Sequence, residues 1–139
     1  MVLAAGVQYK GGQMADMAAL RHEEGVRMDP DRLMALYEDL GEAGAENVVT
    51  RAMEELSFRR AEMQEEYRSG DMDSFARNAR SLGRVAGQVG MVTLSRVSRD
   101  AADCAARGDV VATAATWARL ERISDRSLVA AWDMQDMSV

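Results

Sequence analysis

The chain has 139 residues, of which 47% are hydrophobic, 29% are charged and one is proline, a balance typical of a single globular domain. No apolar run is long enough to cross a bilayer, and the first residues lack the charged start and apolar middle of a signal peptide, so we expect a cytoplasmic protein with no membrane partner. A net charge of −6 disfavours nucleic acid as a partner. Residues 77–139 nevertheless carry +2, against −8 for residues 1–76, so an acidic partner would bind the second half.

Residue types that serve metal or phosphate chemistry are scarce. Cys104 has no second thiol or histidine at zinc-site spacing, and no glutamate stands three residues before His22, the single histidine. Lys10 is the only lysine and belongs to no phosphate-binding loop motif. We therefore expect no enzyme activity, no cofactor and no metal. The glutamates of the long central segment predict a solvated helix face: Glu54, Glu55, Glu62, Glu65 and Glu66.

Helical signals begin after the first residues. Residues 1–13 have three glycines and no periodicity, which predicts a flexible tail before a single domain over residues 14–139. A short helix within residues 14–25 is indicated by Met14, Met17, Ala18 and Leu20. Asp29 and Pro30 suit the N-cap and first position of a second helix, which Gly41 would end. A long helix is expected from about residue 45 to 69, with this inner stripe: Val49, Ala52, Met53, Leu56, Met63 and Tyr67.

Two glycine-aspartate pairs, Gly70-Asp71 and Gly108-Asp109, predict that one helix stops and the next is capped. Apolar residues recur at helical spacing between and after them, with a break at Gly90. The apolar positions expected inside are Phe75, Ala79, Leu82, Ala86, Val89, Leu94, Val97, Ala101, Cys104, Val110, Ala114, Trp117, Leu120, Leu128 and Ala131, with Trp132 in the core or at a helix end. Short connections favour antiparallel neighbours. The predicted fold is all-α, an antiparallel four-helix bundle over residues 45–133 with one or two additional short N-terminal helices.

The helix around residues 78–90 (NARSLGRVAGQVG) has an unusual outer face. At 100° per residue, its apolar positions share one side, whereas Arg77, Arg80, Arg84 and Gln88 lie opposite, with Gly87 beside them. Glycine inside a helix costs about 1 kcal/mol relative to alanine. Two interpretations stay open. The arginines can form a docking face for an acidic partner that approaches closely over the glycines, or the face is merely solvated and the glycines pack inside the bundle.

This stretch resembles the histidine-containing phosphotransfer (HPt) family, whose motif reads approximately A-H-S-L-K-G-x-A-x-N-L-G, commonly with glycine before the asparagine. Residues 79–90, ARSLGRVAGQVG, match the alanines, serine, leucine and last two glycines without gaps. Three further segments look like the family's opening helix, the approach to its histidine and its final helix. They are MDPDRLMALYEDLG (28–41), YRSGDMDSFARNA (67–79) and ARGDVVATAATWARLE (106–121). The resemblance covers about residues 28–133, and it implies a four-helix bundle that works in two-component phosphorelays.

Arg80 stands where the family has its phosphorylated histidine, and Gly83-Arg84 replaces the lysine-glycine pair. A guanidinium stays protonated and is a poor nucleophile, so the resemblance implies a degenerate member without phosphotransfer at this position. It implies a receiver domain of a response regulator, or a histidine kinase, as partner. The expected partner-binding residues are Arg77, Arg80, Gly83, Arg84, Gly87 and Gln88. Two alternatives remain, a structural or dimerising bundle without a receiver partner and a phosphoprotein that uses His22.

Overall fold

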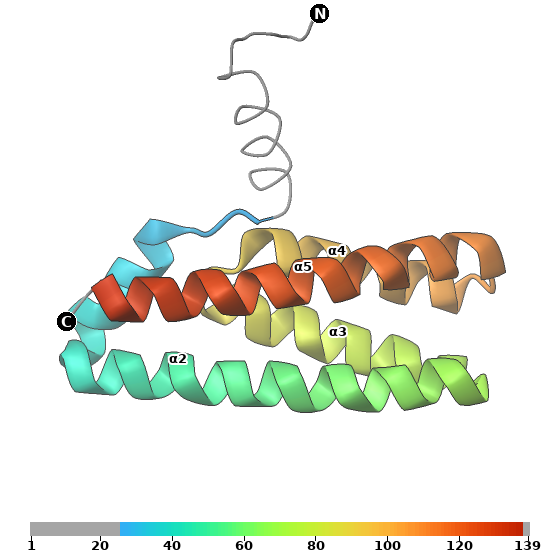
Figure 1. The fold of residues 1–139 in the computed structure, drawn as a ribbon, viewed down its shortest axis with the longest axis horizontal. Helices are drawn as coiled ribbons and strands as arrows, with labels where there is room; N and C mark the ends of the chain where they lie inside the picture. Colours follow the sequence, from blue (N-terminus) through green and yellow to red (C-terminus); the bar gives the residue numbers. More distant parts are fainter. Residues whose placement is uncertain (1–25, 138–139) are drawn as a thin grey trace, which may run out of the picture.

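A computed structural model describes residues 26–137, with side chains to Asp133, and within that range the chain is helical. Four helices pack against one another: α2 (Pro30–Ser69), α3 (Met72–Gln88), α4 (Val92–Ala106) and α5 (Val110–Met137) (Figure 1). Within residues 26–137 the only extended pairing is an isolated bridge between Met28 and Met91. The all-helical prediction is confirmed. The predicted tail 1–13 and the helix within 14–25 lie outside the described residues.

The start of α2 follows from its first residues. The Asp29 carboxylate accepts hydrogen bonds from the backbone N–H of Asp31 (3.0 Å) and of Arg32 (3.3 Å), and Pro30 takes the first turn, as expected. The chain bends at Gly41, which has φ 76° and ψ 172°, but the helix resumes at once. The segment 30–40 is therefore the bent beginning of α2. Gly41 thus interrupts the helix at the residue where the sequence predicted an end, but no loop separates segment 30–40 from the rest of α2.

The predicted helix boundaries are confirmed. Gly70 ends α2 in the left-handed conformation, and the Asp71 carboxylate caps α3 by accepting from the Ser74 N–H at 3.1 Å. Gly108 has φ 72°, and Asp109 accepts from the Ala112 N–H at 3.0 Å at the start of α5. Each pair thus turns the chain within a few residues, and successive helices pack side by side (Figure 1).

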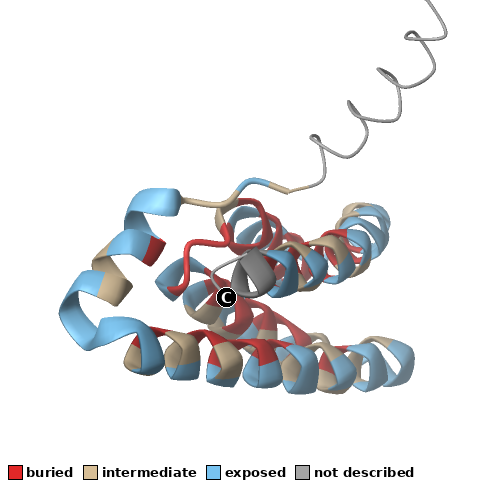
Figure 2. Cartoon of the chain, turned by 60° about the vertical axis from the view of Figure 1, so that its left-hand side comes forward, coloured by how far each residue is buried: buried red, intermediate tan, exposed pale blue. Residues whose placement is uncertain are grey.

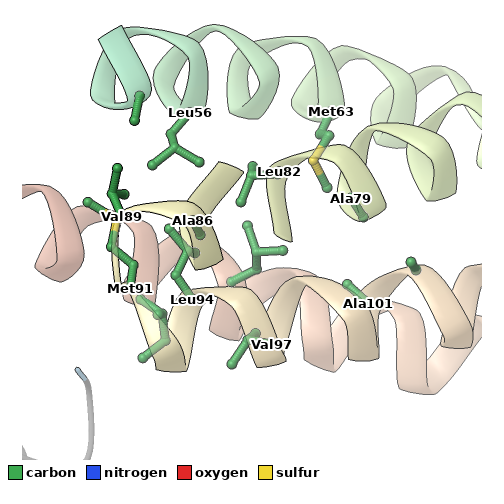
Figure 3. Packing of buried hydrophobic residues seen from close by; sticks show 14 of the residues in the cluster. Leu56, Met63, Ala79, Leu82, Ala86, Val89, Met91, Leu94, Val97 and Ala101 are labelled. Carbon is green, nitrogen blue, oxygen red and sulfur yellow. The ribbon is translucent and has the colours of Figure 1, made fainter. Parts of the chain in front are cut away.

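The core lies between the helices, and buried residues line their inward faces (Figure 2). Leu82 and Ala86 of α3 are fully buried between Leu56 of α2 and Leu94 of α4 (Figure 3). At one end, Tyr67, Phe75 and Trp117 form an aromatic cluster with ring centroids 5.4 to 6.1 Å apart. Burying one leucine side chain contributes about 1.5–3 kcal/mol, so this core fixes which face of α3 points outward.

The tryptophans differ in environment. Trp117 is buried as expected, and Trp132, expected in the core or at a helix end, is 54% exposed on the last turns of α5. Val110 is 78% exposed and Ala114 is also exposed, so the expectation that these two residues lie inside is wrong. Helices α2 and α5 touch least of the neighbouring helices, and Arg60 of α2 bridges them by ion pairs to Asp125 and Glu121. These pairs are partly exposed and contribute little stability.

Candidate functional site

The exposed face of α3 carries the predicted arginines. Phe75, Ala79, Leu82 and Ala86 hold the helix to the core, and this orientation turns Arg77, Arg80 and Arg84 to the surface. Gln88 and Gly87 are also exposed, as predicted. The Arg80 side chain retains 47% of its accessible area in the middle of the helix. The sequence pattern therefore identified the outer face correctly.

Two of the three arginines are oriented by serines of their own helix. The Arg77 Nη2 donates to the Ser74 Oγ at 3.0 Å, and the Arg84 Nη2 donates to the Ser81 Oγ at 3.1 Å. Each guanidinium thus leans one turn towards the start of α3, the usual direction of helical side chains. Because a hydroxyl is neutral, these bonds orient the guanidinium groups without neutralising their charge.

Arg80 instead reaches the neighbouring helix. Its Nη2 lies 3.6 Å from the Asp103 Oδ1 of α4, and the Asp103 side chain is 61% exposed. The separation exceeds the range of a good hydrogen bond, and an exposed ion pair contributes at most about 1 kcal/mol. The positive charge of Arg80 is therefore weakly compensated and open to an external anion.

Gly83 does not belong to the exposed face. It is buried against α4, where a Cβ built on it would lie 3.2 Å from the Ser95 carbonyl oxygen and 3.4 Å from the Ser98 Cβ. The prediction that Gly83 lets a partner approach is wrong, since α4 already occupies that space. A Cβ built on Gly87 would meet only Ser95, at 3.4 Å from its Oγ. Gly87 therefore lies at the solvent-exposed edge of the contact between α3 and α4.

Arg99 of α4 is an additional basic residue that sequence reasoning missed. Its Cγ lies 3.6 Å from the Cβ position of Gly83, and its Nη1 donates to the Ser95 Oγ at 3.4 Å. Ser95, Arg99 and Asp103 recur at four-residue spacing and line the side of α4 that faces α3. We call this contact the α3–α4 seam, comprising Arg80, Gly83, Gly87, Ser95, Arg99 and Asp103. The four-residue spacing could have shown from the sequence that these residues share one side of α4. It could identify Arg99 as a neighbour of α3 only once α4 was known to lie antiparallel beside α3.

On its other flank, α3 meets acidic residues of α2 through Asn78. The Asn78 side chain accepts from the Arg59 Nη1 at 2.8 Å and donates to Glu66 (3.0 Å) and Glu62 (3.3 Å). A shallow polar hollow of about 260 Å³ lies there. Two of the five glutamates predicted to form a solvated face are thus bound to α3. The negative charge of α2 borders the arginine face and does not cover it.

The sequence analysis also considered Cys104, a metal site and His22. Cys104 is free and 7% exposed, as expected for a small buried side chain, and the Arg107 Nη2 lies 3.5 Å from its sulfur. Among residues 26–133, no three histidine, cysteine or acidic side chains are grouped to hold a metal ion. His22 lies outside the described residues. The site is therefore an arrangement of guanidinium groups, suited to binding anions.

The carboxyl group of Asp71, the N-cap of α3, has a lowered pKa. The hydroxyl and then the backbone N–H of Ser74 hydrogen-bond to Asp71 and hold its pKa below the usual value, and the Arg77 charge adds a smaller effect. Asp71 is consequently ionised when it caps the helix that presents the arginines.

No protein-family model, curated protein or solved structure matches the chain. Among the described helices, none is both long and apolar enough to span a bilayer.

Proposed function

We propose that this chain is a cytoplasmic, HPt-like antiparallel four-helix bundle that binds receiver domains, or related partners such as a histidine kinase, without accepting a phosphoryl group at position 80. One observation carries the proposal. Arg80 stands half-exposed at the centre of the outer face of α3, between Arg77 and Arg84, with a single long ion pair to Asp103. This is the position that the resemblance assigns to the family's histidine.

The chemistry of position 80 determines binding without transfer. A phosphoryl acceptor needs a lone pair at physiological pH, which imidazole has and guanidinium lacks. A guanidinium offers a planar fork of N–H donors that matches carboxylate and phosphate oxygens. On this proposal the protein competes with relay proteins for a receiver, or holds a receiver in one state.

The test measures binding and transfer separately. The full chain is titrated into receivers from its own organism, and then incubated with the same receivers carrying radiolabelled phosphate. We expect at least one receiver to bind and no label to appear on the chain. Transfer of label to the chain would overturn the inactive assignment. Failure to bind every receiver and kinase would overturn the partner assignment.

Three variants sharpen this experiment. Arg80→Glu combined with Arg84→Glu should abolish receiver binding, because both charges on the exposed face are reversed. Arg122→Glu is the matched control, since Arg122 is exposed on α5. Arg80→His puts an exposed imidazole at the family position, and acid-labile label on this variant alone would support the HPt-like assignment.

A second candidate is an assembly bundle with no receiver partner. Val129 and Trp132 of α5 are 59% and 54% exposed, and Val129 lines a hollow of about 380 Å³ with Val26 and Met28. Exposed aromatic and aliphatic groups of this kind favour self-association. If the double charge reversal on α3 leaves receiver binding unchanged but Trp132→Ser shifts the oligomeric state, this candidate replaces the first.

A further inference from the structure

The first described residues are held at the junction between α3 and α4. The Asp29 N–H donates to the Gly90 carbonyl oxygen at 2.7 Å, and the Arg27 N–H donates to the Thr93 Oγ1 at 2.7 Å. These hydrogen bonds join parts of the chain that are more than sixty positions apart. The place at which the preceding segment meets the bundle is therefore fixed.

This place lies beside an apolar hollow on α5. The hollow has a volume of about 380 Å³, and Val26 and Met28 line it together with Val129 and Ala130 of α5. Val129 is 59% exposed, so the described residues leave it largely uncovered. The polar residues that complete the lining are Asp125, Arg126 and Asp133.

Trp132 extends the apolar surface along α5. It follows Val129 by three residues, which places both on one side of the helix, and it is 54% exposed. Exposed apolar side chains that lie together, with an aromatic ring among them, are typical of a surface that another segment covers. The lining residues Asp125 and Asp133 lie about 12 Å apart along the helix axis, which sets the length of a suitable occupant.

The sequence provides an apolar segment of matching length next to the hollow. A helix is expected within residues 14–25, with the apolar side chains Met14, Met17, Ala18 and Leu20. As a helix, residues 14–24 would span about 16 Å, enough to cover the hollow. Gly25 alone separates this segment from Val26, and glycine permits the turn that a return onto α5 requires.

We infer that residues 14–24 dock as a short helix in this hollow and cover Val129 and Trp132. The inference does not rest on the receiver partner. It competes with the assembly bundle described above, which needs the same surface uncovered.

The position of the segment favours it over a second copy of the chain. A segment joined by a short linker acts at an effective concentration of about 1 mM. A second copy at micromolar concentration is about a thousandfold more dilute, so the chain's own segment should occupy the hollow first.

The first test substitutes one residue on each side of the proposed contact in the full chain. Met17→Ser and Val129→Ser should each lower the docking equilibrium constant by about tenfold, the loss expected when one buried apolar side chain is replaced. Acrylamide quenching of tryptophan fluorescence should then increase, because Trp132 becomes accessible whereas Trp117 stays buried. The double variant should resemble either single variant, since the same contact is lost in each.

Val7→Ser is the matched control, because it makes the same kind of change before the expected helix begins. Val129 is exposed on the folded bundle, so Val129→Ser tests the contact without disturbing the core. Equal quenching in the wild type, Met17→Ser and Val129→Ser would overturn the inference. An increase in Val7→Ser as large as that in Met17→Ser would overturn it too.

The second test identifies what fills the hollow. A nitroxide is attached at Asp16→Cys, on the side of the expected helix away from Met17, with Cys104→Ala to remove the native thiol. Broadening of the Val129 methyl NMR signals when nitroxide and isotope are in the same chain supports the inference. The absence of broadening in that sample would refute it.

A mixed sample separates the two possible occupants. Nitroxide-labelled chains without isotope are mixed with isotope-labelled chains without nitroxide. Unchanged Val129 signals in this mixture are expected, because each chain fills its own hollow. Broadening in the mixture would mean that a second copy occupies the hollow, and it would replace this inference with the assembly bundle.

Discussion

Alanine substitution of the two glycines in α3 should have opposite effects on stability. Alanine favours a helix by about 0.5–1 kcal/mol over glycine. At Gly87 the new methyl would meet the Ser95 Oγ at an ordinary 3.4 Å, so the protein should gain nearly all of this amount. At Gly83 the methyl would lie 3.2 Å from a backbone oxygen, and relieving such overpacking costs about 1–3 kcal/mol. The free energy of unfolding should therefore rise in Gly87→Ala and fall by about 0–2 kcal/mol in Gly83→Ala.

Urea unfolding followed by far-UV circular dichroism measures this difference. Both glycines lie on the same side of one helix four residues apart, so each variant controls for the other. The midpoints should separate by the equivalent of about 1–3 kcal/mol with an unchanged m-value. If Gly83→Ala is as stabilising as Gly87→Ala, the α3–α4 seam is looser than the structure shows, and the reasoning that places Arg99 over Gly83 fails.

Three further predictions concern single side chains. Leu82→Ala should lower the free energy of unfolding by about 2–5 kcal/mol, because Leu82 is fully buried; a urea midpoint close to wild type would contradict this packing. The Asp71 pKa is lower in the folded chain, so its ionised form stabilises the fold above the unfolded-state pKa of about 3.9, and that stability is lost as pH falls through the folded pKa. The stability difference between wild type and Asp71→Asn should shrink in urea melts at acid pH, and a constant difference would count against the shift. A double-mutant cycle of Arg80→Ala and Asp103→Ala should give a coupling below about 1 kcal/mol, since both groups are exposed; a larger value would mean that the pair is structural.

Local signals predicted most of the helical boundaries. Asp29-Pro30, Gly70-Asp71 and Gly108-Asp109 act through hydrogen bonds to nearby residues in the sequence, so neighbouring residue types are enough to identify them. The outward face of α3 was predictable for a related reason. Leu82 and Ala86 are separated by one helical turn and both are buried. Arg80 and Arg84 lie on the opposite side of the same helix, so they point outward.

Contacts between helices were not predictable in the same way. Gly83 and Arg99 are 16 positions apart, and nothing in either local segment indicates that one covers the other. The sequence left open whether the glycines admit a partner or pack inside the bundle, and the packing of α4 decided that Gly83 is buried. The sequence also left Trp132 between the core and a helix end, and the structure places it on the last turns of α5 with 54% of its surface exposed.

The order of Gly83 and Arg84 links the packing of α3 to its proposed function. In the family that this stretch resembles, the corresponding pair has the large basic residue first and the glycine second. Here the small residue comes first, on the side of α3 that faces α4, and it admits the stem of Arg99. The arginine comes second, on the outer face, where its Nη2 donates to the Ser81 Oγ at 3.1 Å. The order of the two residues therefore separates two roles, because Gly83 serves the contact with α4 and Arg84 stays on the exposed face. On the proposed function, Gly83 would keep α3 packed against α4 while Arg84 stays available to a partner.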